Sequence, residues 1–160
     1  MLNHILADEF GLFTMTRDCR ANVTGPDYQS LRQQLEVQCG QIGEWIDQLA
    51  ERVRAIAVGA SSTWAGLAKA TRTSTDAGTG LSAEHVIWEL LSLYEEMIVQ
   101  LHAAREACTE RYQDADTADF LAGLMEQHQK IAWRLRAEFE TEGHQAWSAQ
   151  PHSHLQKNLR

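Results

Sequence analysis

Apolar residues recur every three or four positions through the long stretch from residue 31 to residue 56. This is the spacing of one face of an α-helix, and no proline interrupts it. A helix of this length, about 39 Å at 1.5 Å per residue, has to bury its apolar face against other helices. The pattern therefore favours a helical fold, and it is carried by Leu31, Leu35, Cys39, Ile42, Ile46, Leu49, Val53 and Ile56.

Three further stretches have the helical period. They predict helices over residues 2–22, 82–111 and 116–143, in addition to one that begins at Asp27 and runs to residue 56. Asp27 and Asp116 are the expected N-cap residues of the second and fourth helices. Turn residues follow the first helix and the third, so the chain should form two helical hairpins.

The segment from residue 57 to residue 80 is rich in Gly, Ala, Ser and Thr, and it has to cross from one hairpin to the other. Residues 62–70 within it are expected to form a short helix. This order predicts an all-α, ferritin-like four-helix bundle, with a long crossover carrying a short helix between the second and third helices. The periodicity ends after Gly143, so we expect one domain over 1–143 and a flexible or surface-docked tail over 144–160.

The composition excludes several classes of protein. Of the 160 residues, 44% are hydrophobic and 22% are charged, which is typical of a soluble globular domain and not of a disordered chain. The net charge of −8 has the wrong sign for a protein held to nucleic acid by its overall field. No membrane-spanning stretch or export signal is recognisable, and three unpaired cysteines suit reduced thiols, so the expected location is the cytoplasm.

A metal centre inside the bundle is not expected. Helical bundles of this type commonly use Glu-x-x-His pairs as metal ligands, and no histidine of this sequence has a glutamate three residues before it. Carboxylates instead share one face of the second helix, at Glu36, Asp47 and Glu51. They are either part of an oxygen-rich metal site completed by another subunit or an ordinary solvated acidic face. His128 lies on the apolar face of the fourth helix and is interpreted as a hydrogen-bonded core or interface histidine.

Four short motifs make the sequence resemble the Dps family, mini-ferritins that protect DNA during starvation and oxidative stress. The resemblance covers Leu2 to about Glu140. It rests on Asn22-Val-Thr-Gly-Pro26, Ile46-Asp-Gln-Leu-Ala-Glu-Arg52, Asp116-Thr-Ala-Asp-Phe-Leu121 and Lys130-Ile-Ala-Trp133. It implies a dodecameric shell that takes up Fe(II), oxidises it with hydrogen peroxide and stores the ferric product.

The resemblance also implies a ferroxidase site shared between two subunits. Two histidines and an acid of one subunit face an Asp and a Glu of the other. Glu36 matches the first acid, and Asp47 and Glu51 match the facing pair. The two histidine positions are occupied here by Arg20 and Arg32.

Arginine changes the chemistry of such a site because a guanidinium group has no lone pair to offer a metal and stays protonated. We expect that the iron site has become an intersubunit cluster of ion pairs, in which Arg20 and Arg32 face Asp47 and Glu51. The function predicted first is therefore an iron-binding, iron-storage shell for stress protection whose ferroxidase site is lost or remodelled. The alternative is an active ferroxidase in which the arginines point to solvent and Glu36, Asp47 and Glu51 still bind Fe(II).

The tail supplies two further hypotheses. His144, His152 and His154 could gather a metal ion, although a disordered or docked polar end is the simpler interpretation. The tail also carries Lys157 and Arg160, so a third possible function is a DNA-compacting particle that acts through its tails. A shell of chains with this negative charge would repel phosphates, and we expect DNA binding to be weak or absent near neutral pH.

Overall fold

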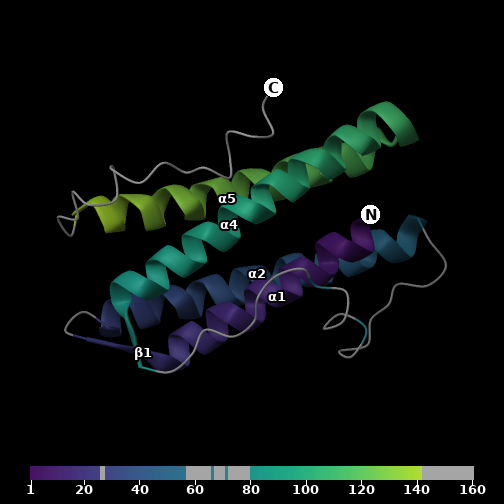
Figure 1. The fold of residues 1–160 in the computed structure, drawn as a ribbon. Coiled ribbons are helices and arrows are strands. Elements are labelled where there is room, and N and C mark those ends of the chain that lie inside the picture. Colours follow the sequence, from purple (N-terminus) through teal and green to yellow (C-terminus); the bar gives the residue numbers. More distant parts are fainter. Residues whose placement is uncertain (26–27, 57–65, 67–70, 72–79, 142–160) are drawn as a thin grey trace.

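The computed structural model describes residues 1–25, 28–56, 66, 71 and 80–141 of the chain, without the side chains of residues 139–141. Four long helices dominate these residues: α1 (Leu2–Asn22), α2 (Tyr28–Ile56), α4 (Ala83–Ala107) and α5 (Ala115–Thr141). Figure 1 shows them as two hairpins, α1 with α2 and α4 with α5. The predicted four-helix bundle is confirmed.

The start and end of each helix agree closely with the sequence pattern where the residues are described. The expected N-cap at Asp27 and nearly all of the expected short helix over 62–70 lie outside the described residues. Helix α4 is capped by Ser82, whose hydroxyl accepts a hydrogen bond from the backbone N–H of His85 at 3.2 Å. Its α-helical part ends four residues earlier than predicted, because a π-helix over Cys108–Tyr112 continues it.

The fourth helix is capped by a different residue from the one the sequence indicated. Asp114, and not Asp116, accepts a hydrogen bond from the backbone N–H of Thr117 at 3.0 Å, and α5 begins at Ala115. Gln113 adopts φ = 53° between the π-helix and this cap, which turns the chain sharply. The correction moves the cap two residues toward the turn and leaves Asp116 in the first turn of the helix.

Two very short strands join the hairpins at one end of the bundle. Strand β1 (Val23–Thr24) pairs in parallel with β2 (Leu81–Ser82), and the Thr24 hydroxyl donates to the Leu81 carbonyl at 3.2 Å. The pairing fixes the end of α1 beside the start of α4. It has no counterpart in the sequence analysis, because two-residue strands leave no periodic pattern.

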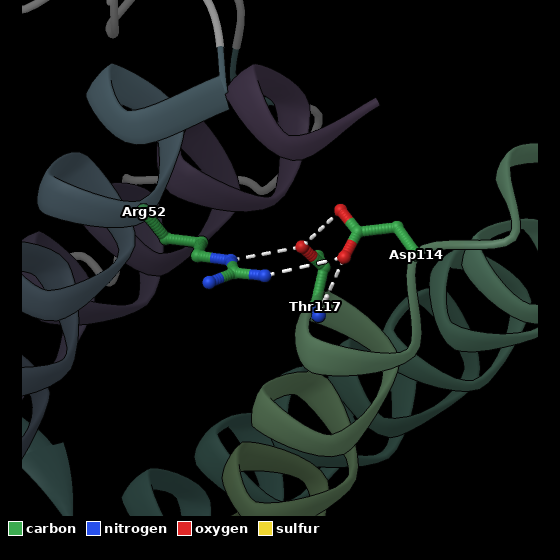
Figure 2. A network of polar contacts seen from close by, with 3 residues as sticks. All are labelled: Arg52, Asp114 and Thr117. Carbon is green, nitrogen blue, oxygen red and sulfur yellow. Dashed lines mark hydrogen bonds and ion pairs between the residues drawn. The ribbon is translucent and has the colours of Figure 1, made fainter.

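The opposite end is joined by a polar network of three residues, shown in Figure 2. Arg52 of α2 donates from Nε to the Thr117 hydroxyl at 2.8 Å and from an Nη atom to Asp114 at 3.2 Å. The Thr117 hydroxyl in turn donates to Asp114 at 2.5 Å. The last turns of α2 are therefore tied to the first turn of α5 through the residue that caps α5.

Large aliphatic side chains from all four helices fill the centre of the bundle. None of the helices in the described part of the chain is long and apolar enough to cross a membrane. The core also contains polar residues, including Glu9, Gln38, Thr117 and His128. The largest fully buried side chains of the core are those of Tyr94, Leu6, Leu12, Met15, Leu35, Ile42, Leu49, Leu90, Leu101, Leu121, Leu135 and His128.

Candidate metal centre

The three candidate carboxylates lie on the outer surface of α2, where all of them are exposed. Glu36 and Asp47 are eleven residues apart, which corresponds to about 16 Å along the helix axis. Asp47 and Glu51 are one turn apart. Within the described residues, no group of three or more His, Cys, Asp or Glu side chains is placed to hold a metal ion. One chain by itself therefore does not assemble the predicted site.

Glu36 forms an ion pair with Arg20, which reaches it from the last turn of α1. The Arg20 side chain is 29% exposed and the Glu36 side chain is 64% exposed. The Nε atom of Arg20 is buried and has no hydrogen-bond partner in the part of the chain that the structure describes. The sequence analysis placed Arg20 opposite the acids of a second subunit and did not consider this pairing within one chain.

Arg32 lies on the exposed face of α2, one turn before Glu36. Arg17 lies one turn before Arg20 on α1, with its guanidinium 5.7 Å from the centre of the Phe13 ring. The end of α1 and the start of α2 therefore present three cations, while the second half of the exposed face of α2 presents acids. This polarity along the surface is a property of the folded hairpin.

Gly40 and Gly43 lie on α2 near the candidate acids, and a glycine on a helix surface leaves room for a neighbouring backbone. A Cβ atom added at Gly40 would meet nothing within 4 Å, so this glycine is open to the outside. At Gly43 the same atom would lie 3.9 Å from the Phe13 ring of α1, so Gly43 faces its own hairpin. Only Gly40 is free to accept a partner.

The thiols near this surface are not available as metal ligands. All three cysteines are free and buried. Burial raises the pKa of Cys19 to about 12, and it also raises the pKa of Cys39 against the opposing effect of Arg20 and Arg17. Because the thiolate is the form that binds metals, these groups add nothing to the site at neutral pH.

Six of the seven histidines fall into three groups. His85 and His102 form exposed pairs with Glu89 and Glu106, at 3.6 and 3.7 Å, which are ordinary i, i+4 contacts. His128 is fully buried and its Nδ1 lies 2.9 Å from the Leu124 carbonyl, so its interpretation as a hydrogen-bonded core histidine is confirmed. The tail residues His144, His152 and His154 lie outside the described residues.

Sequence reasoning missed the partner of His128. Its Nε2 lies 2.9 Å from Oε1 of Glu9, and both side chains are fully buried. Glu9 adjoins the apolar stripe that predicted α1, so its burial could not be read from that pattern. A histidine on the apolar face of another helix was the available signal that a polar partner must exist.

Comparisons with known proteins agree with the fold and the motifs. Residues 1–142 match the sequence model of the ferritin-like domain family. An uncharacterised low temperature-induced protein of Nostoc sp. is 35% identical over 88% of this chain and 78% of its own. The DNA protection during starvation protein 2 of Bacillus anthracis is 30% identical over 86% of this chain and 92% of its own.

Solved structures of Dps proteins superpose on the bundle. The Dps protein from Bacillus brevis has a TM-score of 0.79 and 27% identity, covering 85% of this chain and 90% of that one. Dps from Staphylococcus aureus has a TM-score of 0.81 at 23% identity, covering 86% and 91%, which shows likeness of fold. The chain belongs to the ferritin-like family. Within that family it is a member of the Dps group.

Proposed function

We propose that this protein assembles into a cytoplasmic dodecameric shell that binds and stores iron during stress, and that its ferroxidase site is remodelled. Membership of the Dps group supports iron storage, since one such solved structure is titled a member of a superfamily of ferritin-like diiron-carboxylate proteins. Fe(II) is here the substrate and the stored cargo. With a net charge of −8 per chain, DNA binding is expected to be weak or absent near neutral pH.

The observation that carries the proposal is the ion pair between Arg20 and Glu36. A carboxylate that would otherwise offer oxygen ligands to Fe(II) is held by a guanidinium group of its own chain. Guanidinium carries a permanent positive charge and no acceptor atom, so it repels a ferrous ion from the same space. Arg20 therefore stands in place of a histidine ligand, and its ion pair also makes the Glu36 carboxylate less available to a metal ion.

The remaining groups suit a contact between two copies of α2 that run antiparallel. If the twofold axis passes between residues 41 and 42, next to the open Gly40, residues at equal distances on either side of it face each other. Glu36 then lies at the level of Asp47 of the second copy, and Arg32 lies at the level of its Glu51. The charges of Arg32 and Glu51 are opposite, so the contact is stabilised by ion pairs at a position where an iron site would need a ligand with a free lone pair.

The alternative is an active ferroxidase that uses Glu36, Asp47 and Glu51. Asp47 and Glu51 support it, because both are exposed and stand one helical turn apart on α2. Two ferrous ions would each give one electron to hydrogen peroxide, which takes up two protons and leaves as water. Such a site would need Arg20 to release Glu36.

Stopped-flow measurement of Fe(II) oxidation by peroxide tests the proposal. The wild type should oxidise Fe(II) slowly, and the double variant Arg20→His/Arg32→His should be at least about tenfold faster, because imidazole supplies the missing lone pairs. The matched control is Arg105→His/Arg134→His, which changes two exposed arginines of α4 and α5 and should leave the rate unchanged.

Two results would contradict the proposal. Rapid peroxide-dependent oxidation by the wild type would favour the active ferroxidase. An unchanged rate in the Arg20→His/Arg32→His variant, with its shell intact by electron microscopy, would show that the arginines are not the cause of the slow reaction.

A further inference from the structure

Glu9 and His128 form a pair at the centre of the bundle that the iron chemistry does not use. Glu9 belongs to α1 and His128 to α5, so the pair connects the two helical hairpins. Their side chains are fully buried, with Oε1 of Glu9 2.9 Å from Nε2 of His128. Within the described residues, the second oxygen of Glu9 has no hydrogen-bond partner. A buried carboxylate in this state requires a compensating positive charge.

The histidine cannot be neutral while Glu9 is ionised. Nδ1 of His128 lies 2.9 Å from the Leu124 carbonyl, which can only accept, so Nδ1 carries a hydrogen. In neutral imidazole the lone pair would then be on Nε2, facing an oxygen of Glu9. Two lone pairs at this distance repel each other. A cation between or on the two atoms removes the repulsion.

A proton fits the position better than a metal ion. Within the described residues, no third His, Cys, Asp or Glu side chain joins Glu9 and His128 to form a group that could hold a metal ion. Aromatic rings lie beside the imidazole, with the Trp45 ring at 4.7 Å and the Tyr94 ring at 5.6 Å. A divalent ion bound to one carboxylate would leave an uncompensated positive charge in the core. A protonated imidazole beside a carboxylate gives a pair with no net charge.

We propose that Glu9 and His128 form a proton-dependent lock between the two hairpins. The lock is closed when both nitrogens of His128 are protonated. It is released when the proton on Nε2 leaves, because the Glu9 carboxylate is then buried without a compensating charge. The alignment between Nε2 and Oε1 is poor for a hydrogen bond, so the attraction is mainly one of charge.

The pKa of His128 sets the direction of the effect. Burial alone lowers this pKa, but the charge of the nearby Glu9 carboxylate and the Leu124 carbonyl together raise it above the ordinary value of 6.5. A raised pKa in the folded state means that the stabilisation is complete below about pH 6.5 and is lost as the pH rises through the raised value.

The tyrosine, tryptophan and glutamine beside the pair do not titrate in this range. On α4, burial raises the pKa of Tyr94 well above 10, and its hydroxyl lies 3.5 Å from Gln38 of α2. Trp45 and Gln38 of α2 carry no charge. On α1, Asp8 is also buried, but Glu9 supplies the carboxylate that contacts the imidazole.

Urea unfolding of the intact protein between about pH 6 and pH 10 tests the lock. Above about pH 6.5 the unfolding constant of the wild type should rise by up to about tenfold per pH unit until His128 has lost its proton. The variant Glu9→Gln/His128→Gln keeps the shape of the pair without its charges, so this rise of the unfolding constant with pH should disappear. The control His102→Gln alters an exposed Glu–His pair and should retain the rise of the unfolding constant with pH.

A second measurement reads His128 directly. Histidine-selective NMR should show one resonance that titrates above pH 6.5 in the wild type and is absent from Glu9→Gln/His128→Gln. In the single variant Glu9→Gln it should titrate below pH 6.5, because burial, the largest effect on this pKa, is then opposed only by the Leu124 carbonyl. Equal pH dependence of wild type and double variant, or a stoichiometric metal in the wild type that the double variant lacks, would overturn the proposal.

Discussion

Among the acid–cation pairs that join helices in the described residues, one lies inside the core and another lies on the surface. Glu9 and His128 are fully buried, with two aromatic rings beside the imidazole, whereas Glu36 and Arg20 are 64% and 29% exposed. Water screens the surface pair, and either residue can be solvated if the other is removed. Neither member of the buried pair has that option. The same kind of contact therefore has a structural role in the core, whereas on the surface the proposed function gives it a role in what α2 can bind.

The largest expected effect comes from breaking the buried pair. The substitution His128→Leu leaves the Glu9 carboxylate without a partner and should lower the free energy of unfolding by about 3 to 5 kcal/mol near pH 6. The double substitution Glu9→Leu/His128→Leu removes both charges and should recover most of this loss. Urea denaturation provides the measurement. A loss below about 1 kcal/mol for the single substitution would mean that the buried pair behaves like the exposed one.

An intermediate effect is expected at the network of Figure 2. Thr117 is fully buried, and the substitution Thr117→Val removes the hydroxyl between Arg52 and Asp114, which should destabilise the protein by about 1 to 2 kcal/mol. The exposed Thr109 donates to the Arg105 carbonyl, so Thr109→Val is a matched control expected to stay within about 0.5 kcal/mol. Similar losses in both variants would remove the difference between buried and exposed hydroxyls.

The same network should also respond to acid. Hydrogen bonds from Thr117, and then the charge of Arg52, lower the pKa of Asp114. Asp114 therefore contributes stability above the ordinary carboxyl pKa of 3.8, and this contribution is lost as the pH falls through the lowered value. Asp114→Asn should give melting temperatures that fall less steeply between about pH 5 and pH 2. An unchanged slope would show that Asp114 is not one of the groups that titrate on unfolding.

The smallest effect on stability is expected at the surface pair. Arg20→Gln should change the free energy of unfolding by less than about 1 kcal/mol, and the change should shrink further in high salt. Its effect on Fe(II) binding should be larger, because Glu36 becomes available as an oxygen ligand. Isothermal titration with Fe(II) under anaerobic conditions compares the variant with wild type. A large loss of stability in Arg20→Gln, without any gain in Fe(II) binding, would mean that the surface pair is structural and does not control metal binding.

Much of the fold could be predicted because each helix of a bundle buries one face, and the apolar residues of that face recur with the helical period. The repeat from Leu31 to Ile56 fixed α2 to within one residue of its observed start at Tyr28. Features without a period were not predicted: the two-residue strands, the π-helix after Ala107 and the cap at Asp114. Each of these features depends on hydrogen bonds between a few residues near a turn. At the start of α5, Asp114 and Asp116 are both suitable N-cap residues by type, so the sequence does not distinguish them.

The candidate site could be predicted only in part. The exposed positions of Glu36, Asp47 and Glu51 follow from their spacing on α2. The pairing of Glu36 with Arg20 does not follow, since it depends on how α1 packs beside α2. Glu9 was missed for a related reason. Helix α1 packs against both α2 and α4, so it is buried on more than one side and its polar residues do not mark an outer face.

The sequence by itself determined that this chain forms long amphipathic helices, that two arginines stand where the Dps pattern has histidines, and that the chain is acidic. The tertiary structure decided which charges meet. A helix fixes the spacing of its own side chains at 3.6 residues per turn, but the approach of two helices depends on the packing of the whole core. That packing brought Glu9 to His128 inside the bundle and Arg20 to Glu36 on its surface.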